Sequence, residues 1–211
     1  QGYFYLTTKF AEKVELDQTT PLSKIVAIAA GKLHALALSS DGTVFAWGTD
    51  EAGQLGYENI VNTSPVASHT PNLVMADAEN PLEEIVSISA GHLHSLALTL
   101  QGTVLAWGGD VYGQLGDGEE NSSDQDPVVV VTEEGSPLDG VVSISSGGLH
   151  NLALRNDGTL WSWGYGNQGQ LGIGTGSPYS LMVPLEAGSV DFAQGGAFHS
   201  LVMVTDGTIC S

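Results

Sequence analysis

The 211-residue sequence has very few basic residues. It contains five Lys and Arg against 24 Asp and Glu, which gives a formal net charge of −19, and no Lys or Arg occurs between residues 33 and 154. Proteins that bind nucleic acid draw most of their affinity from such groups, and an anionic membrane surface would repel this charge. We therefore expect no nucleic-acid partner. The composition favours a saline or extracellular setting, with the cytoplasm as the alternative.

Cysteine and long apolar runs are also scarce. The lone Cys210 excludes a disulfide framework within the chain. No apolar run reaches the roughly 18 residues that a membrane-spanning helix needs, so we expect no membrane insertion. No Ser/His/Asp or Cys/His arrangement is legible, and no paired carboxylates lie in an apolar context. The sequence therefore predicts neither an enzyme nor a cofactor.

Glycine is abundant, with 28 residues, and much of it belongs to a fixed repeat. A Gly is followed three residues later by His, then by a turn such as Asp41-Gly42-Thr43, and then by Trp-Gly and Gly-Gln-Leu-Gly. Successive His residues are 60, 56 and 49 residues apart, although the spacing within a unit is constant. This is typical of a repeat architecture whose insertions lie in loops. The structural repeat positions are Gly31, His34, Trp47, Gly91, His94, Trp107, Gly147, His150, Trp163, Gly196 and His199.

Each repeat predicts four short antiparallel strands, because β-prone runs alternate with tight turns. We therefore predict an all-β fold, a β-propeller of four-stranded antiparallel blades, present as an incomplete arc of about three and a half blades. The longer connections at 56–81 and 116–137 are expected at one rim of the arc. The predicted segments are 1–20 (outer strand of a preceding blade, or an extension), 21–80 (repeat 1), 81–136 (repeat 2), 137–183 (repeat 3) and 184–211 (incomplete repeat 4).

The combination of Gly-x-x-His, a Leu-Ala-Leu strand, Asp-Gly-Thr, Trp-Gly and Gly-Gln-Leu-Gly resembles the regulator of chromosome condensation repeat from residue 21 onward. Members of that family resemble seven-bladed propellers, so the resemblance implies that the chain is part of a larger ring. The family includes an exchange factor for the small GTPase Ran, ubiquitin-ligase and signalling scaffolds, a plant ultraviolet receptor and a secreted bacterial enzyme inhibitor. The shared residues are structural ones and do not choose among these roles.

Several residues suggest a metal or nucleotide site, and each of them also has a simpler, structural interpretation. The repeated histidines recur once per blade, too far apart for one ion, so we expect each to be hydrogen-bonded between blades. Zinc at His92 and His94, expected on one face of a strand, is a weak alternative. Residues 164–169 match a dinucleotide fingerprint but open a turn where a helix is needed. A solvated acidic loop is preferred over a weak calcium candidate formed by Asp117, Glu119, Asn121 and Asp126.

We predict a non-catalytic protein–protein interaction or scaffold module that binds a protein partner, expected to be basic, through an acidic, loop-bearing rim. One alternative is a structural domain of a secreted or surface-assembled bacterial protein that self-associates through blade edges. The other is a guanine nucleotide exchange factor for a small GTPase. Asn62 and Asn121 are glycosylation acceptors only in a compartment that uses them. The predicted rim residues are Tyr57, Tyr112, Asp117, Glu119, Glu120, Asp124, Asp126, Tyr165 and Tyr179.

Overall fold

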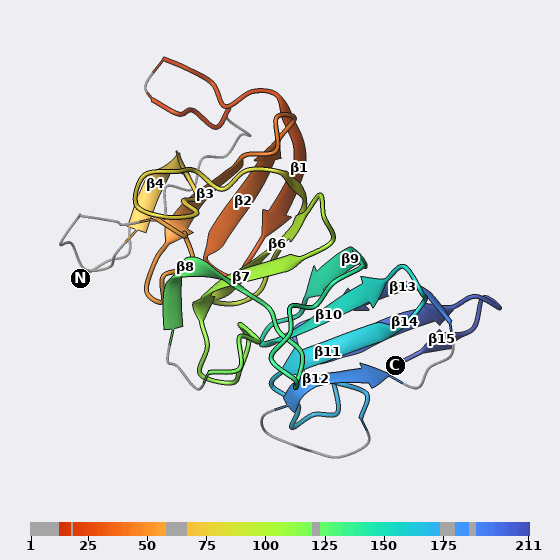
Figure 1. Cartoon of the computed structure of the whole chain (residues 1–211). Coiled ribbons are helices and arrows are strands. Elements are labelled where there is room, and N and C mark those ends of the chain that lie inside the picture. Colours follow the sequence, from red (N-terminus) through yellow and green to blue (C-terminus); the bar gives the residue numbers. More distant parts are fainter. Residues whose placement is uncertain (1–12, 18, 58–66, 120–122, 174–179, 186–188) are drawn as a thin grey trace.

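The computed structural model describes residues 13–17, 19–57, 67–119, 123–173, 180–185 and 189–211, in which every regular element is a β-strand (Figure 1). The strands form four antiparallel sheets, which confirms the predicted all-β class. No helix in these ranges has the length and apolar character of a membrane span. We call the four sheets blades 1 to 4 in chain order.

Each of the first three blades has four strands in sequential order. Blade 1 contains β1 (Ile25–Ala30), β2 (His34–Ser39), β3 (Val44–Thr49) and β4 (Ala67–Leu73). Blade 2 contains β5 (Ile85–Ala90), β6 (His94–Thr99), β7 (Val104–Gly109) and β8 (Ser123–Val129). Blade 3 contains β9 (Val141–Ser146), β10 (His150–Arg155), β11 (Leu160–Gly164) and β12 (Ser180–Leu185). The described part of blade 4 contains β13 (Val190–Gly195), β14 (Ser200–Val204) and β15 (Ile209–Cys210).

The first strands lie on the inner side of the arc, because β1, β5, β9 and β13 contact one another in succession. The alternating strand directions give each blade two ends. One end, the histidine face, carries the Gly-x-x-His connections and the connections that follow the third strands. The other end, the turn face, carries the Asp-Gly-Thr hairpins and the connections to the next blade.

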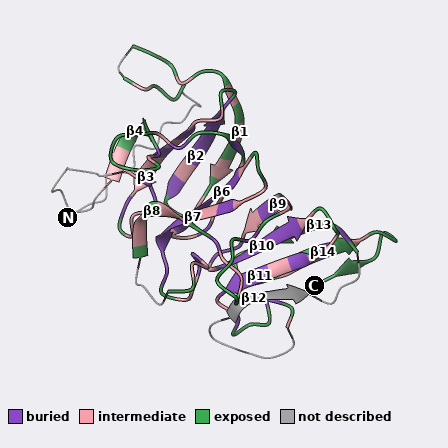
Figure 2. Cartoon of the chain, in the orientation of Figure 1, coloured by how far each residue is buried: buried purple, intermediate pink, exposed green. Residues whose placement is uncertain are grey.

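The hydrophobic core lies between blades. One cluster packs Leu36, Leu38 and Val44 of blade 1 against Trp107 of blade 2, and a second packs Leu96 and its neighbours against Trp163 of blade 3. A third cluster joins blade 3 to blade 4. Figure 2 shows the buried residues along β2, β6 and β10, the second strands of their blades. Because Trp107 and Trp163 are buried against neighbouring blades, blade-to-blade contact supplies most of the apolar burial.

The connection between blades has a constant form. Leu82 N–H donates to Val74 O at 2.8 Å, and Leu138 N–H donates to Val130 O at 2.9 Å. Leu22 N–H donates to Val14 O at 2.8 Å in the same way. Residues 14–22 thus have the geometry of a connection that enters a blade, whereas most of the outer strand predicted over residues 1–20 lies outside the described residues.

The third repeat differs from the sequence-based alignment. Pro184 lies inside β12, opposite Trp161, whereas Pro81 and Pro137 come after the fourth strands of their blades. The predicted boundary between residues 183 and 184 therefore falls within a strand. An outermost strand tolerates Pro because half of its N–H groups need no strand partner, so the sequence alone could not separate these positions.

The segments 56–81 and 116–137 are not simple rim connections, but their extra length does lie at one end of the blades, as expected. The segments 56–81 and 116–137 each contain a complete fourth strand, which runs from the histidine face to the turn face. The third repeat is shorter because residues 186–189 alone link its fourth strand to the next blade, where the earlier blades use residues 74–84 and 130–140. The difference in length lies at the turn face.

The Gly-x-x-His spacing follows from the packing of the ring over the glycine. A Cβ added to Gly91 would lie 2.1 Å from Cε1 of His94. The corresponding distances are 2.3 Å at Gly31, 2.1 Å at Gly147 and 2.3 Å at Gly196. Any side chain at this position would therefore displace the His ring.

Replacing Gly91 by Ala should destabilise the fold by roughly 2–3 kcal/mol, because the methyl group overlaps a ring that has no room to move. The matched control is Gly135→Ala, where φ is +76° and nothing lies within 4 Å of the added Cβ. That control should cost about 1 kcal/mol, from backbone strain alone. Urea denaturation measures both, and equal losses would contradict the packing explanation.

Candidate interaction surface

A hydrogen-bonded relay joins each blade to the next on the histidine face. His94 Nε2 lies 2.8 Å from Asn151 Oδ1, and Asn151 Nδ2 donates to Gln114 O at 2.8 Å. Because Asn151 Oδ1 can only accept, His94 carries its proton on Nε2 and donates it. The ring thus connects β6 of blade 2 to β10 of blade 3.

The other two described interfaces have the same relay with a serine in place of Asn151. His34 Nε2 lies 2.9 Å from Ser95 Oγ, which donates to Gln54 O at 2.9 Å. His150 Nε2 lies 2.8 Å from Ser200 Oγ, which donates to Gln170 O at 2.7 Å. Since each hydroxyl donates to a carbonyl, it accepts from the histidine Nε2–H.

The Gln of the Gly-Gln-Leu-Gly turn has two functions besides its part in the relay. Its carbonyl also accepts the indole N–H of the next blade, with Trp107 Nε1 to Gln54 O at 3.0 Å and Trp163 Nε1 to Gln114 O at 2.9 Å. Its side-chain Oε1 accepts a backbone N–H within the turn, from Ala52 in blade 1 at 2.8 Å. Sequence reasoning missed both functions, although a Gln in the same place in every turn was the available signal.

Burial keeps the relay histidines neutral. Burial, with a smaller contribution from neighbouring histidines, lowers the pKa of His34, His94 and His150 to about 4. His199, the fourth repeat histidine, is exposed on blade 4. His34, His94 and His150 thus hold the blades together as neutral hydrogen-bond donors.

His92 does not share a strand face with His94. It lies in the connection before β6 and its ring meets that of Phe198 edge to face, with centroids 6.1 Å apart, while His94 is buried in the relay. The expectation of two histidines on one face of a strand was therefore wrong. No group of three His, Cys, Asp or Glu residues that could hold a metal ion occurs in the part of the chain that the structure describes.

The acidic segment lies beside blade 2 on the histidine face. Asp117 Oδ1 accepts from Glu119 N–H at 3.0 Å, and Asp124 Oδ1 accepts from Asp126 N–H at 3.1 Å. Asp124 is opposite Gly108 in the β7–β8 pairing, which places it near the end of β7. Glu120, Asn121 and Tyr179 lie outside the described residues. We call Asp117, Glu119, Asp124 and Asp126 the acidic rim.

Two of the four predicted tyrosines come together. The rings of Tyr112 and Tyr165 have centroids 4.8 Å apart with an interplanar angle of 57°, and both side chains are half-buried. They follow the third strands of blades 2 and 3, so this tyrosine pair bridges two blades on the histidine face. Tyr57 is not part of it, since its hydroxyl accepts from Asn72 Nδ2 at 3.3 Å in blade 1.

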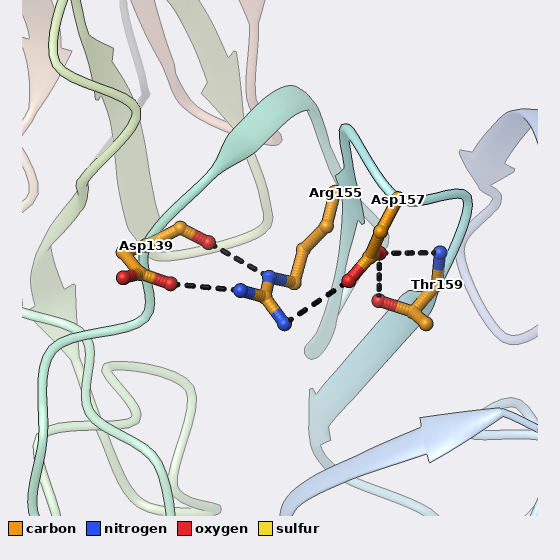
Figure 3. A network of polar contacts seen from close by, with 4 residues as sticks. All are labelled: Asp139, Arg155, Asp157 and Thr159. Atoms are coloured by element: carbon orange, nitrogen blue, oxygen red, sulfur yellow. Dashed lines mark hydrogen bonds and ion pairs between the residues drawn. The ribbon is translucent and has the colours of Figure 1, made fainter.

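Arg155, the only basic residue after Lys32, is engaged within the protein on the turn face (Figure 3). Its NH2 group lies 2.8 Å from Asp139 Oδ1, and its NH1 group lies 3.4 Å from Asp157 Oδ2. Asp157 in turn accepts from the backbone and hydroxyl groups of Thr159. The described surface of blades 2 to 4 therefore offers no unpaired Lys or Arg to an anionic ligand.

Comparison with known families and proteins gives a consistent result. The family model described as Regulator of chromosome condensation (RCC1) repeat matches residues 41–98, 101–154 and 157–203, and a second model of the same description matches 25–54, 85–114 and 141–170. The human protein named Probable E3 ubiquitin-protein ligase HERC6 is 36% identical over 188 residues, which cover 86% of this chain and 17% of that protein. Protein pim1 of Schizosaccharomyces pombe is 32% identical over 209 residues, covering 90% of this chain and 37% of that protein.

Solved structures agree with the fold. Human WBSCR16 superposes with a TM-score of 0.74 at 27% identity, covering 88% of this chain and 46% of that one. Yeast RCC1 (Prp20), solved with Kap60, gives 0.73 at 26% identity, with coverages of 94% and 45%. The predicted fold, a β-propeller arc of four-stranded blades, is confirmed. The chain spans less than half the length of each of these relatives.

Stability should fall as the pH drops from 6.5 to 4. Each relay histidine has a folded-state pKa of about 4, below the value of 6.5 expected for the unfolded chain, so acid protonates the unfolded state first. The effect is up to about 3 kcal/mol for His94. The free energy of unfolding from urea titrations at several pH values measures it.

The variant His94→Gln should reduce this pH slope by about one third, because one of three such groups is removed. His69→Gln is the control, since His69 is exposed in β4. An unchanged slope in His94→Gln would contradict the assignment of the pH dependence to the relay.

Proposed function

The chain belongs to the regulator of chromosome condensation (RCC1) repeat family, and from this premise we propose that it is a protein-interaction module that binds a basic protein segment. The binding surface is the acidic rim together with the tyrosine pair. The observation that carries the proposal is that non-repeated acidic and aromatic side chains lie on the same face of a chain whose net charge is −19.

Electrostatics supports a basic partner. An excess of negative charge attracts a cationic segment over several ångströms and speeds its association. The sole basic residue of blades 2 to 4, Arg155, is already paired with Asp139 and Asp157, so it opposes this attraction only weakly. The related Prp20p of Saccharomyces cerevisiae has binding properties to Gsp1p and histones, and histones are basic proteins.

The tyrosine pair supplies the apolar part of the surface. Tyrosines that are half-buried and stacked are already partly ordered, so a partner that packs on them loses little further side-chain entropy. Because the pair bridges blades 2 and 3, it is held by the relay between those blades. We assign Tyr112 and Tyr165 as the apolar anchors of the partner, and the acidic rim as the part of the surface that favours a positively charged partner.

The proposed module is not catalytic. The relay histidines are buried, neutral and hydrogen-bonded, so they are not available as general bases at a surface. The ligase named among the relatives is far longer, and this chain covers 17% of it, so that activity is not assigned to the chain. An exchange-factor role is the alternative, which a nucleotide-release assay with small GTPases would reveal.

Neutralising the acidic rim should weaken binding of a fluorescent Lys/Arg-rich peptide by roughly tenfold at low salt, as expected when four partly exposed charges are removed. The variant is Asp117→Asn, Glu119→Gln, Asp124→Asn and Asp126→Asn, which keeps an amide oxygen for each turn hydrogen bond. Fluorescence anisotropy at low and high ionic strength measures the affinity. Raised salt should weaken the binding of the peptide to the wild-type protein, so that the affinities of the wild type and the variant become similar.

The control removes four charges from the opposite face, at Glu79, Glu83, Glu133 and Glu134, each replaced by Gln. Both variants carry a net charge of −15, which is −19 plus four, so only the position of the lost charge differs. Equal loss of affinity in the two would show that bulk charge, and no particular rim, attracts the peptide. Wild-type binding that is indifferent to salt would also count against the proposal.

Replacing Tyr165 by Ala should weaken the same peptide complex by about tenfold at every salt concentration, because an apolar anchor is lost and no charge changes. Tyr57→Ala is the matched control, as Tyr57 lies apart from the pair in blade 1. The thermal midpoints of both variants verify the fold. A Tyr165 effect no larger than that of Tyr57 would remove the tyrosine pair from the binding surface.

A further inference from the structure

The histidine face has a small hollow at its inner side, where the four Gly-x-x-His connections meet. It has a volume of about 220 Å³, and residues of all four blades line it. Most of the lining residues are Gly, Ala or Ser, so the backbone forms much of the wall. Two longer side chains complete the lining, Lys32 from blade 1 and His92 from blade 2. We call this site the inner hollow.

Hydrogen bonds between successive connections hold the wall of the inner hollow. Lys32 N–H donates to Gly91 O at 3.2 Å, and His92 N–H donates to Gly148 O at 2.9 Å. Gly148 N–H in turn donates to Gly196 O at 3.2 Å. Lys32 and His92 each follow the glycine of their repeat, so they hold the same position in neighbouring blades. The repeat backbone therefore fixes where both side chains begin.

The ring of His92 is positioned by two later blades. A Cβ added to Gly148 would lie 2.8 Å from both Cε1 and Nε2 of His92, so the ring lies directly over this glycine. The ring of Phe198 meets it edge to face, with centroids 6.1 Å apart. His92 is half-buried, and an imidazole ring carries an N–H donor in either charge state. The ring is therefore a positioned hydrogen-bond donor in the wall of the hollow.

The local charge at the inner hollow is opposite in sign to the charge of the chain. None of the described residues that line it is Asp or Glu. The four connections, residues 31–34, 91–94, 147–150 and 196–199, contain no acidic residue either. Burial, followed by the positive charge of Lys32, lowers the pKa of His92. Lys32 and His92 are thus close enough for an anion in the hollow to meet both of them.

The net charge of −19 opposes an anion, but distance and salt limit its effect here. The acidic rim belongs to the fourth strand of blade 2 and the residues before it, whereas the inner hollow adjoins the first strands. Neighbouring strands lie about 4.8 Å apart, so three spacings separate the two sites by roughly 14 Å. This exceeds the Debye length of about 8 Å at physiological ionic strength. The charge of Lys32, in the wall itself, therefore outweighs that of the acidic rim.

We propose that the inner hollow binds one small oxyanion, a carboxylate or a phosphate, held by the ammonium group of Lys32 and the ring N–H of His92. An ammonium group binds such anions as a point charge, and the imidazole adds a directed hydrogen bond. The hollow has room for one such group and a few waters, since a water molecule takes about 30 Å³. The site uses neither the acidic rim nor the tyrosine pair, so it does not rest on the proposed function.

Nuclear magnetic resonance of the 211-residue chain tests the site, with sodium phosphate as one probe, sodium acetate as the other, and ionic strength held constant with sodium chloride. The phosphate should shift the His92 Hε1 signal saturably and raise the pKa of His92, because a bound anion favours the imidazolium. Lys32 and the buried His94 are the titratable neighbours of this ring. His69, exposed in β4, should show neither effect.

The two probes distinguish the sources of the anion. Saturation by acetate at a concentration equal to or below that of phosphate would assign a carboxylate, and tighter binding of phosphate would assign a phosphate group. No saturable shift of His92 with either anion up to about 50 mM would overturn the proposal. A shift of the same size at His69 would also overturn it, since that would show an effect of the solution and no site.

Lys32→Gln should weaken binding of the preferred anion by roughly fivefold, the upper range for one exposed charge pair. Lys24→Gln is the matched control, because Lys24 is exposed just before β1 on the turn face. Both variants carry a net charge of −20, which is −19 minus one, so only the position of the lost charge differs. Equal affinities in the two variants would contradict the role of Lys32.

The variant with a neutralised acidic rim separates this site from the basic-peptide surface. It should bind the anion at least as tightly as the wild type, because the charges that it lacks repel an anion. The same variant should lose affinity for the basic peptide. Anion binding without peptide binding, or the reverse, therefore shows which of the two proposals fails.

Discussion

The hydrogen-bonded relay between blades is the constraint on which the rest of the structure depends. A buried polar group without a partner costs about 1–3 kcal/mol, so a histidine between two sheets is stable only if its donor is satisfied. The relay achieves this with Ser95, Asn151 or Ser200. Each of these side chains accepts from the histidine and donates a hydrogen bond to a Gln carbonyl oxygen. The glycine three residues before each histidine leaves room for the ring. Glycine, histidine and glutamine therefore have one cause for their regular spacing.

The repeated residues could be predicted from the sequence because they obey local rules. Glycine with positive φ at Gly42, Gly102 and Gly158 makes the hairpin turns, and the alternating apolar residues mark the strands. The relay acceptors could not be predicted in the same way, because Ser95 and Asn151 differ chemically and only their contact with a histidine unites them. Pro184 was misaligned for a related reason, since an outer strand accepts proline as readily as a connection does.

Binding of a partner depends on the residues that do not repeat. Because the relay buries its histidines, and Trp107 and Trp163 pack against neighbouring blades, the repeat leaves mainly turns and outer strands for a partner. On the histidine face these carry the acidic rim and the tyrosine pair, and on the turn face Arg155 is enclosed by two carboxylates. The sequence identified these residues as candidates. It did not indicate that Tyr112 and Tyr165 would meet, since they hold different positions within their repeats.

The arc is polar in the geometric sense, because a blade turns different surfaces to its two neighbours. A leucine such as Leu36 is buried because the next blade covers it, and the equivalent Leu201 is exposed because no described blade follows. Stability in such a repeat is a sum of nearest-neighbour contacts, so each junction between blades contributes on its own.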